Sequence, residues 1–262
     1  MVWGKTATAA QKLHNVGEKM NSEKLSMRLE MVAKYIPEGS RIADIGSDHA
    51  YLPCHVVKCG KVPFAIAGEV VEGPYQSAKR HVDGEGLSDK IHVRKGDGLE
   101  VISPGEVDCI TISGMGGSLI TSILETGKNK LDKVKRLILQ PNLSAISIRV
   151  WLIDHGWELI GEEILEEDRK IYEILIAAKG SPTKPYEHHD FNAGLLLGPF
   201  LMAEKSDVFL KKWRSEVKNW GKILSNLETA SKTEENSRKK EELHKKIMMV
   251  EEVLAYEKSE WS

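Results

Sequence analysis

The chain has 262 residues, of which 41% are hydrophobic and 29% charged, and its formal net charge at pH 7 is −2. This composition is typical of a soluble globular protein and differs from that of a strongly basic nucleic-acid binder. No apolar run approaches the roughly 20 residues that span a bilayer, so we expect no membrane association. Three cysteines are too few for a disulfide framework, which agrees with a cytoplasmic location, and they lack the spacing of a metal site, so no metal is expected.

The N-terminal segment, residues 1–19, mixes small, polar and basic residues without a continuous apolar stretch. It does not have the pattern of a secretory signal, and we expect it to lie outside the fold. Residues 20–36 then carry apolar side chains at steps of three and four, which predicts a helix that ends at Pro37.

Five short apolar segments of strand length follow, separated by stretches of helix or loop: residues 41–45, 63–68, 91–94, 108–113 and 136–139. This alternation predicts a mainly parallel sheet that is covered by helices on both faces. Residues 157–166 and 170–178 then predict an antiparallel hairpin at the sheet edge. The expected fold class is α/β, with a Rossmann-like sheet of the class I methyltransferase type, because five parallel strands followed by such a hairpin differ from a nicotinamide domain.

The predicted catalytic domain covers residues 20–180 and is followed by a linker, rich in Pro, His and charge, over residues 181–195. Residues 196–262 are expected to form an antiparallel helical hairpin of the coiled-coil type, with a polar break at residues 229–233. Apolar residues recur at steps of three and four in both helices, including Phe209, Trp213, Val217, Trp220, Leu224, Leu243, Ile247, Val250 and Leu254. The hairpin would therefore bury one apolar stripe along its length.

Ligands of open parallel sheets bind beyond the carboxyl ends of the strands, so these ends are the first place to look for a site. The first strand ends in Asp44-Ile45-Gly46, and Gly46 would let the turn approach a ligand without a Cβ in the way. The dinucleotide fingerprint G-x-G-x-x-G is absent, because Asp48 and Tyr51 occupy positions where glycines are expected. A pyrophosphate loop is therefore disfavoured, although a plain structural turn also explains Gly46.

The second and third strands end in acids, Glu69 and Asp97. A carboxylate at the end of the second strand accepts two hydrogen bonds from a ribose diol, and one at the third strand accepts from an adenine amino group. Each acid has a simpler explanation as well. Glu69 precedes a helical stretch, where an acid is favourable, and Gly96-Asp97-Gly98 is an ordinary turn sequence.

The fourth and fifth strands end in Ser113-Gly114-Met115-Gly116-Gly117 and in Gln140-Pro141-Asn142. The glycines expose backbone donors and acceptors and leave room for a flat group, although a purely steric glycine turn is also possible. The side-chain amides of Gln140 and Asn142 could read the edge of a base. Together the five strand ends favour a nucleoside cofactor beside a substrate base.

These residues resemble a known family. The runs Asp44 to Pro53, Gly68-Glu69, Gly96 to Leu99, Ser113 to Gly117 and Gln140 to Asn142 are similar to motifs of bacterial tRNA (adenine-22, N1)-methyltransferases. The similarity covers nearly the whole chain from about Met20. The resemblance implies a Rossmann-like catalytic domain that uses S-adenosylmethionine, releases S-adenosylhomocysteine, and carries a C-terminal coiled coil that helps to hold tRNA.

The resemblance also implies roles for single residues. The cofactor would be held by Asp44, Gly46, Glu69, Asp97, Gly98 and Ser113, with Gly46 at the amino-acid moiety, Glu69 at the ribose and Asp97 at the adenine. The target base would be bordered by Gly114, Met115, Gly116, Gln140 and Asn142.

Methylation of adenine N1 needs positioning more than a strong base, because N1 has an in-plane lone pair. N1 lies on the Watson–Crick edge, so the adenine must be unpaired or extruded before it can react. The methylated base is a cation, which Asp48 would stabilise. We expect Tyr51 to stack on the base and His49 to orient it, although a histidine at a helix start is as often structural.

Residues 205–222 contain six basic and two acidic residues, and this is where phosphate attraction has the clearest basis. We expect Lys211, Lys212, Arg214 and Lys218 to grip the backbone of tRNA. The opposing interpretation is a solvated helix face of mixed charge.

Other functions remain open from the sequence. A methyltransferase that acts on a small molecule or a protein side chain would turn over without RNA. A non-catalytic helical adaptor would transfer no methyl group, and a nicotinamide oxidoreductase is disfavoured by the missing glycines. We expect a monomer.

Overall fold

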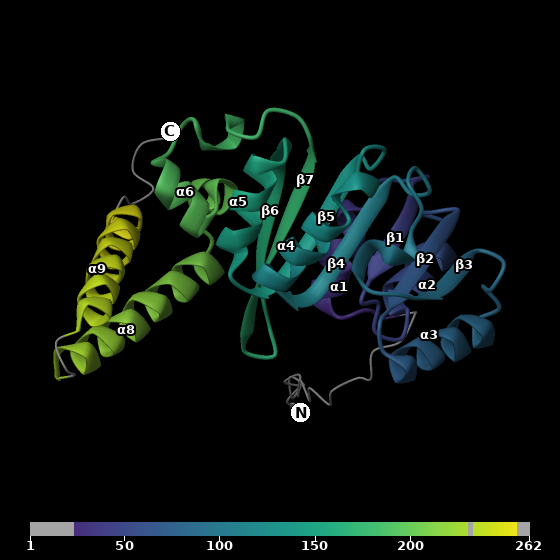
Figure 1. Cartoon of the computed structure of the whole chain (residues 1–262), viewed down its shortest axis with the longest axis horizontal. Coiled ribbons are helices and arrows are strands. Elements are labelled where there is room, and N and C mark those ends of the chain that lie inside the picture. The colour runs from purple at the N-terminus through teal and green to yellow at the C-terminus, as the bar shows by residue number, and fades with distance from the viewer. Residues whose placement is uncertain (1–23, 230–232, 256–262) are drawn as a thin grey trace, which may run out of the picture.

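The computed structural model describes residues 24–229 and 233–255 of the chain. Its centre is a sheet with the strand order β3-β2-β1-β4-β5-β7-β6 (Figure 1). The strands are β1 (Arg41–Ile45), β2 (Phe64–Glu69), β3 (Ile91–Lys95), β4 (Cys109–Gly116), β5 (Arg136–Leu143), β6 (Trp157–Glu167) and β7 (Lys170–Lys179). Strands β1 to β5 are parallel, whereas β7 is antiparallel to both of its neighbours, β5 and β6. The predicted α/β, Rossmann-like sheet with its antiparallel hairpin is confirmed.

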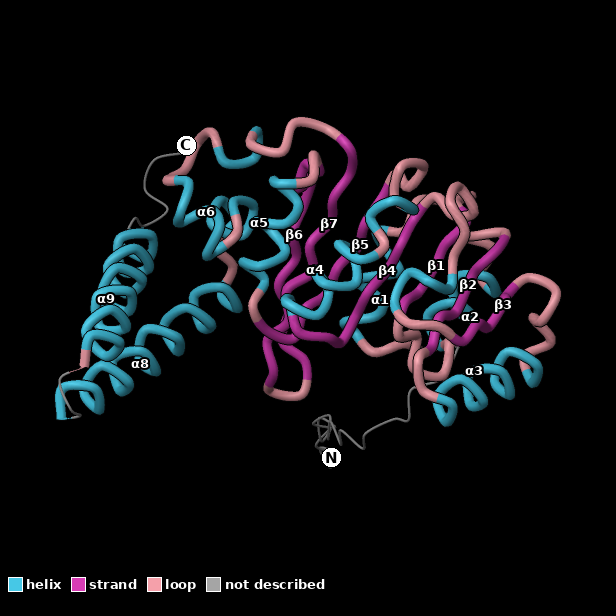
Figure 2. Tube along the Cα trace, in the orientation of Figure 1, coloured by secondary structure: helices cyan, strands magenta, loops and turns pink. Residues whose placement is uncertain are grey.

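Helices connect the strands and continue beyond the sheet (Figure 2). The α-helices are α1 (Met27–Tyr35), α2 (Tyr51–Lys58), α3 (Glu72–Gly84), α4 (Gly117–Thr126), α5 (Ala145–Asp154), α6 (Phe191–Leu197), α7 (Pro199–Glu204), α8 (Asp207–Thr229) and α9 (Glu234–Ala255). Short 3-10 helices are η1 (Gly98–Val101), η2 (Lys128–Lys130) and η3 (Lys184–Tyr186). None of the helices in the described ranges is both long enough and apolar enough to cross a bilayer.

Two apolar layers enclose the sheet, because its central strands are buried on both faces. Helices α4 and α5 supply one layer, which includes the fully buried Ile110, Ile112 and Ile120. Helices α1, α2 and α3 supply the other layer, which includes Val32 and Val56. This arrangement leaves the carboxyl edge of the parallel strands as the place where side chains can meet a ligand.

Strands β4 and β5 are longer than the sequence predicts. The predicted strands end at Ser113 and Leu139, whereas Gly114 to Gly116 and Gln140 to Leu143 also lie inside the observed strands. The register shifts between Ser113 and Met115, where Gly114 has a φ of +80°. A β-bulge at a glycine lets the pairing continue while the backbone turns, which explains how the glycine-rich motif stays in the sheet.

The segment between the hairpin and the long helices is more ordered than the predicted linker. It contains η3, whose Tyr186 is buried, and the short helices α6 and α7 on either side of Gly198. The apolar positions of these two helices join Phe209 and Trp213 of α8 and Val250 of α9 in a third buried cluster. Helix α8 leads away from the sheet, and α9 returns alongside α8 (Figure 1). The segment predicted to lie outside the fold, residues 1–19, falls outside the described residues.

Candidate functional site

The carboxyl edge of the sheet brings the predicted cofactor residues into one row. In the parallel register Ile45 of β1 lies opposite Gly68 of β2, and Glu69 lies opposite Lys95 of β3. Gly46, Glu69 and Asp97 therefore follow three neighbouring strands at the same edge, as the sequence predicts. The backbone N–H of Gly96 donates to the carbonyl of Glu69 at 3.0 Å, which fixes the turn before Asp97 against β2.

The turn between β1 and α2 has an unusual backbone. Gly46 has a φ of +70°, and Asp48, His49 and Ala50 have φ values of +39°, +66° and +58°. Left-handed conformations are costly for residues with a Cβ, and such strain is concentrated at functional sites. The result of this conformation is that the Asp48 N–H points at Glu69 and donates to its Oε1 at 2.6 Å.

Two buried carboxylates lie at this edge without a strong cationic partner. Burial raises the pKa of Asp44 to about 6, even though Thr111 Oγ1 donates to its Oδ1 at 2.6 Å. Burial also raises the pKa of Glu69, partly offset by the hydrogen bond from Asp48. A positively charged ligand would lower both pKa values, so the site is electrostatically prepared for a cation.

A cavity of about 310 Å³ opens beside this row, over the ends of β1, β4 and β5. It is lined by Arg28, Leu29, Asp44, Gly46, Ser47, Asp48, Leu52, Ser113, Gly114, Met115, Asn142 and Tyr172. The hydroxyl of Ser113 is buried and has no hydrogen-bond partner among the described residues, so it is left for a ligand. A Cβ on Gly46 would lie 2.2 Å from Met115 Cε, so the β1 turn and the β4 bulge are in close contact here.

The glycine-rich end of β4 is held by side chains of β5 and α1. Gln140 Oε1 accepts from the Gly114 N–H at 3.0 Å and from Arg28 Nη1 at 2.5 Å. Asn142 Nδ2 donates to the Gly114 carbonyl at 2.6 Å. Gln140 is completely buried and its Nε2 donates to the Pro141 carbonyl. The expectation that Gln140 reads the base does not fit this burial, because both ends of its amide are used inside the protein; Gln140 fixes the Gly114 backbone instead.

His49 and Tyr51 lie beside this cavity rather than in its wall. His49 Nδ1 is 2.6 Å from Ser77 Oγ, and its Nε2 is 3.5 Å from Asp48 Oδ1. The Tyr51 ring packs 5.5 Å from the His49 ring and 5.0 Å from the His81 ring. This packing explains why Tyr51 is poorly placed to stack on a base, whereas Asp48 lines the cavity and its side chain is exposed.

Comparison with known proteins identifies the family. The family described as tRNA (adenine(22)-N(1))-methyltransferase, TrmK, matches residues 42–252. A curated relative, the tRNA (adenine(22)-N(1))-methyltransferase of Bacillus subtilis (strain 168), is 52% identical over 90% of this chain and 99% of its own length. This chain belongs to the TrmK family. Its predicted family and its predicted class of enzyme, a tRNA adenine-N1 methyltransferase, are thereby confirmed.

Solved structures of TrmK proteins agree with this assignment. The crystal structure of the B. subtilis m1A22 tRNA methyltransferase TrmK has a TM-score of 0.86 at 52% identity, covering 88% of this chain and 99% of that one. M. capricolum TrmK, solved with the cofactor product S-adenosyl-homocysteine, has a TM-score of 0.74 at 29% identity, covering 87% of this chain and 96% of that one. The family assignment argues against the adaptor and the nicotinamide oxidoreductase.

The residues of this TrmK chain fit the predicted cofactor. S-Adenosylmethionine carries a sulfonium and an ammonium group, and the buried Asp44 and Glu69 supply negative charge at the strand ends. The bond from Asp48 occupies only Oε1 of Glu69, so Oε2 is left for a ribose hydroxyl. Asp97 is exposed at the start of η1, and Gly98, with a φ of +51°, lies so close to Ile123 that a Cβ would come within 2.9 Å.

The TrmK site includes two residues that sequence reasoning missed, Arg28 and Tyr172. Arg28 lines the cavity, bonds Gln140 and lies with its Cζ 5.2 Å from the centre of the Tyr172 ring. The available signal was the position of Arg28 on the apolar face of its helix, three residues after Leu25. Nothing in the sequence pointed to Tyr172. It reaches the cavity because β7 pairs beside β5 in the sheet, and this strand order was not predicted.

Two of the four cations predicted to grip tRNA are already paired. Lys211 Nζ is 2.6 Å from Glu166 Oε2, and Lys212 forms an ion pair with the buried Glu173. Glu173 also accepts from Arg149 Nη2 at 2.6 Å, and Arg149 Nε donates to Glu162 at 2.7 Å. Lys212 therefore attaches α8 to β7, whereas the Lys211 side chain stays 61% exposed beside its ion pair with Glu166, and the grip of these lysines on tRNA stays a prediction.

The other two predicted cations remain exposed. Arg214 and Lys218 lie four residues apart on α8, and Lys222 extends the same face by one more turn. In the part of the chain that the structure describes, none of the three forms an ion pair. The described residues also contain no cluster of three or more His, Cys, Asp or Glu side chains that could hold a metal.

Proposed function

We propose that this chain transfers the methyl group of S-adenosylmethionine to N1 of adenine 22 in tRNA. The observation that carries the proposal is the row of Gly46, Glu69 and Asp97 at one sheet edge, next to a cavity bounded by Asp48, Gly114 and Asn142. Membership of the TrmK family supports the same reaction. A monomeric state and a cytoplasmic location stay predictions.

The cofactor half of the site is assigned to the ends of β1, β2 and β3. When bound, the cofactor supplies an electrophilic methyl group on a positively charged sulfur. Glu69 Oε2 accepts from the ribose, Asp97 accepts from the adenine amino group, and Asp44 offsets the positive charge of the amino-acid end. The strained turn at Asp48 to Ala50 keeps Glu69 oriented through the Asp48 N–H.

The target adenine is assigned to the cavity over β4 and β5. The exposed Asn142, fixed by its bond to the Gly114 carbonyl, meets the base edge, and Met115 lies against the flat face. No strong base is needed, since the N1 lone pair is free at neutral pH, and correct orientation supplies much of the rate enhancement. Asp48 offsets the charge that appears on the methylated base, and His49, held by Ser77, orients Asp48.

The tRNA body is assigned to the exposed face of α8. Arg214, Lys218 and Lys222 form a basic stripe that contacts phosphates of the tRNA backbone. Phosphate contacts position a nucleic acid without reading its sequence. Lys218→Ala should reduce the slope of log affinity against log salt by about one. Lys133→Ala, at the amino-end edge of the sheet, is the matched control and should leave this slope unchanged. Equal slopes for Lys218→Ala and the native chain would remove the stripe from the proposal.

The reaction is tested by incubating the chain with labelled S-adenosylmethionine and unmodified tRNA, followed by nucleoside analysis. We expect N1-methyladenosine from the unmodified tRNA with adenine at position 22 and none from the same transcript with uridine at position 22. Label that appears in another nucleoside, or in small molecules without RNA, would refute the proposed substrate.

A further inference from the structure

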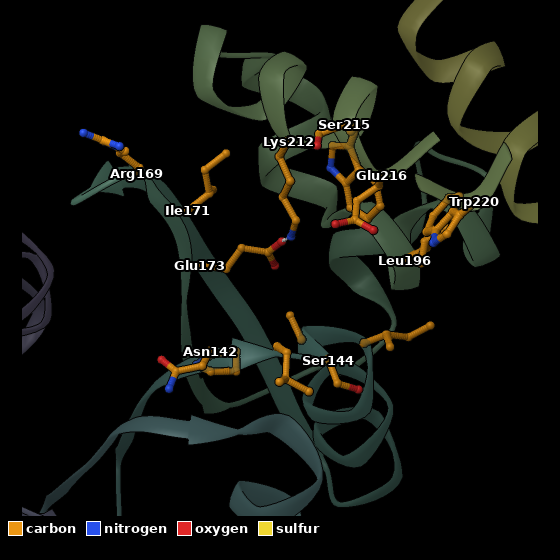
Figure 3. A pocket seen from close by; sticks show the side chains of 15 residues that line it. Asn142, Ser144, Arg169, Ile171, Glu173, Leu196, Lys212, Ser215, Glu216 and Trp220 are labelled. Carbon is orange, nitrogen blue, oxygen red and sulfur yellow. Dashed lines mark hydrogen bonds and ion pairs between the residues drawn. The ribbon is translucent and has the colours of Figure 1, made fainter. Parts of the chain in front are cut away.

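A second cavity, of about 440 Å³, lies between the catalytic sheet and α8. Its floor is the end of β5 and the start of α5, with Asn142 and Ser144, and its roof is α8, with Lys212 and Glu216 (Figure 3). Asn142 lines this cavity and the active-site cavity as well. The two cavities are therefore neighbours, separated by the tip of β5.

The walls of this second cavity suit a flat, uncharged group. Lys212 points at Glu173 across the cavity, and this pair belongs to the buried network with Arg149 and Glu162, in which two positive charges meet two negative ones (Figure 3). Arg169 and Glu216 also line the cavity, so two basic and two acidic side chains face it and the lining as a whole carries no net charge. A phosphate would meet as many acids as bases there, whereas a nucleobase carries no charge to compensate.

Apolar and polar groups are arranged around this neutral wall as a base would require. The half-exposed Trp220 ring and Leu196 lie together at one end of the cavity, and an aromatic ring of this kind is a stacking surface for any base. Glu216 and Ser144 supply a carboxylate and a hydroxyl group for the base edge. Leu143, 68% exposed at the tip of β5, lines this cavity and follows Asn142, which lines both cavities.

We propose that this cavity binds the base of a nucleotide adjacent to the target adenine, stacked on Trp220, while Leu143 keeps the two bases apart. The proposal rests on the proposed function, because it requires an RNA substrate with its adenine in the active-site cavity. The exposed Leu143 side chain would separate the extruded adenine from its neighbour, since apolar side chains wedge between bases in other nucleic-acid complexes.

The test uses the full chain and unmodified tRNA. Trp220→Ala should weaken tRNA binding and raise its KM by about 10-fold, the effect of losing one base–aromatic stack, with the Kd for S-adenosylmethionine unchanged. Trp220→Phe should restore most of the affinity. Ile223→Ala, which removes another exposed apolar side chain of α8 outside the cavity, should have no effect.

A second measurement covers the possibility that Trp220→Ala disturbs α8. A tRNA that carries a photoreactive pyrimidine next to adenine 22 should crosslink to the native chain at Trp220 or Leu143. Unchanged tRNA affinity in Trp220→Ala, or crosslinks that map elsewhere, would overturn the proposal. Either result would leave the proposed function intact as long as the native chain still forms N1-methyladenosine, so the two failures are distinguishable.

Discussion

Replacing Asp44 by Asn should stabilise the free protein and weaken its cofactor site at the same time. Asp44 is only 4% exposed, and burial raises its pKa from 3.8 to about 6. A carboxyl group whose pKa is raised by folding contributes most stability at low pH, where it is protonated in both the folded and the unfolded chain. This contribution is lost as the pH rises above the unfolded pKa and through the folded pKa. At one pKa unit per 1.36 kcal/mol, the loss amounts to about 3 kcal/mol at neutral pH and above.

The free energy of unfolding, measured by urea titration with tryptophan fluorescence, checks this prediction. The difference between Asp44→Asn and the native chain should grow by roughly half of the full amount, about 1.5 kcal/mol, between pH 5 and pH 8. In excess S-adenosylmethionine the native chain should become more stable than Asp44→Asn. The positively charged cofactor favours the charged Asp44, so its binding stabilises the native chain more than the variant.

Asp108→Asn, directly before the neighbouring strand β4, provides the matched control. The pKa of Asp108 is lowered, chiefly because it accepts a hydrogen bond from the Arg41 N–H, and it also pairs with Lys135. Its contribution has the opposite sign, since it is present at neutral pH and lost on acidification. A difference for Asp44→Asn that does not change with pH would refute the assignment of Asp44 as a buried, uncompensated carboxylate.

Further expectations concern packing and reactivity. Gly117→Ala should destabilise the chain strongly, since its Cβ would lie 2.0 Å from the backbone oxygen of Ser144. Gly116→Ala should be tolerated, because its Cβ would lie 3.9 Å from Leu143 Cδ1, an ordinary contact distance. The melting temperatures of the two variants check this difference. Arg149→Met should cost about 3–5 kcal/mol in urea titrations because it leaves two buried carboxylates without their cation, and a loss below 1 kcal/mol would contradict the network. Cys59, the exposed cysteine, should react with a thiol reagent in the folded state, whereas the two buried cysteines should react only after unfolding.

The parallel sheet and the row of residues at its strand ends could be predicted because both depend on local pattern, whereas the strand order was not predicted. Five apolar runs separated by helices specify a parallel sheet, and a parallel sheet places the ends of its strands at one edge. Gly46, Glu69 and Asp97 needed no further information. The same reasoning gave the β6–β7 hairpin, whose turn residues Asp168 and Arg169 both have positive φ values, +49° and +62°.

What could not be predicted depends on contacts between distant residues. The role of Gln140 is set by Gly114, 26 residues away, and by Arg28, 112 residues away, and no local pattern encodes either contact. Likewise, the basic run of α8 does not reveal which lysines meet the acids of β6 and β7. Sequence reasoning therefore could not distinguish Lys212, which pairs with the buried Glu173, from the exposed Lys211.

The attachment of α8 has a consequence for the range of substrates. Helix α8 has 23 residues, which at about 1.5 Å each makes it roughly 35 Å long, and its first turns are tied to the sheet by Lys211 and Lys212. Because Glu166 and Glu173 belong to β6 and β7, the helix is anchored to the hairpin strands and projects a fixed length from them. If α8 holds tRNA as proposed, an RNA fragment that carries the reactive adenine but is too short to reach the far turns of α8 should lose those contacts, so we expect it to bind more weakly than a folded tRNA.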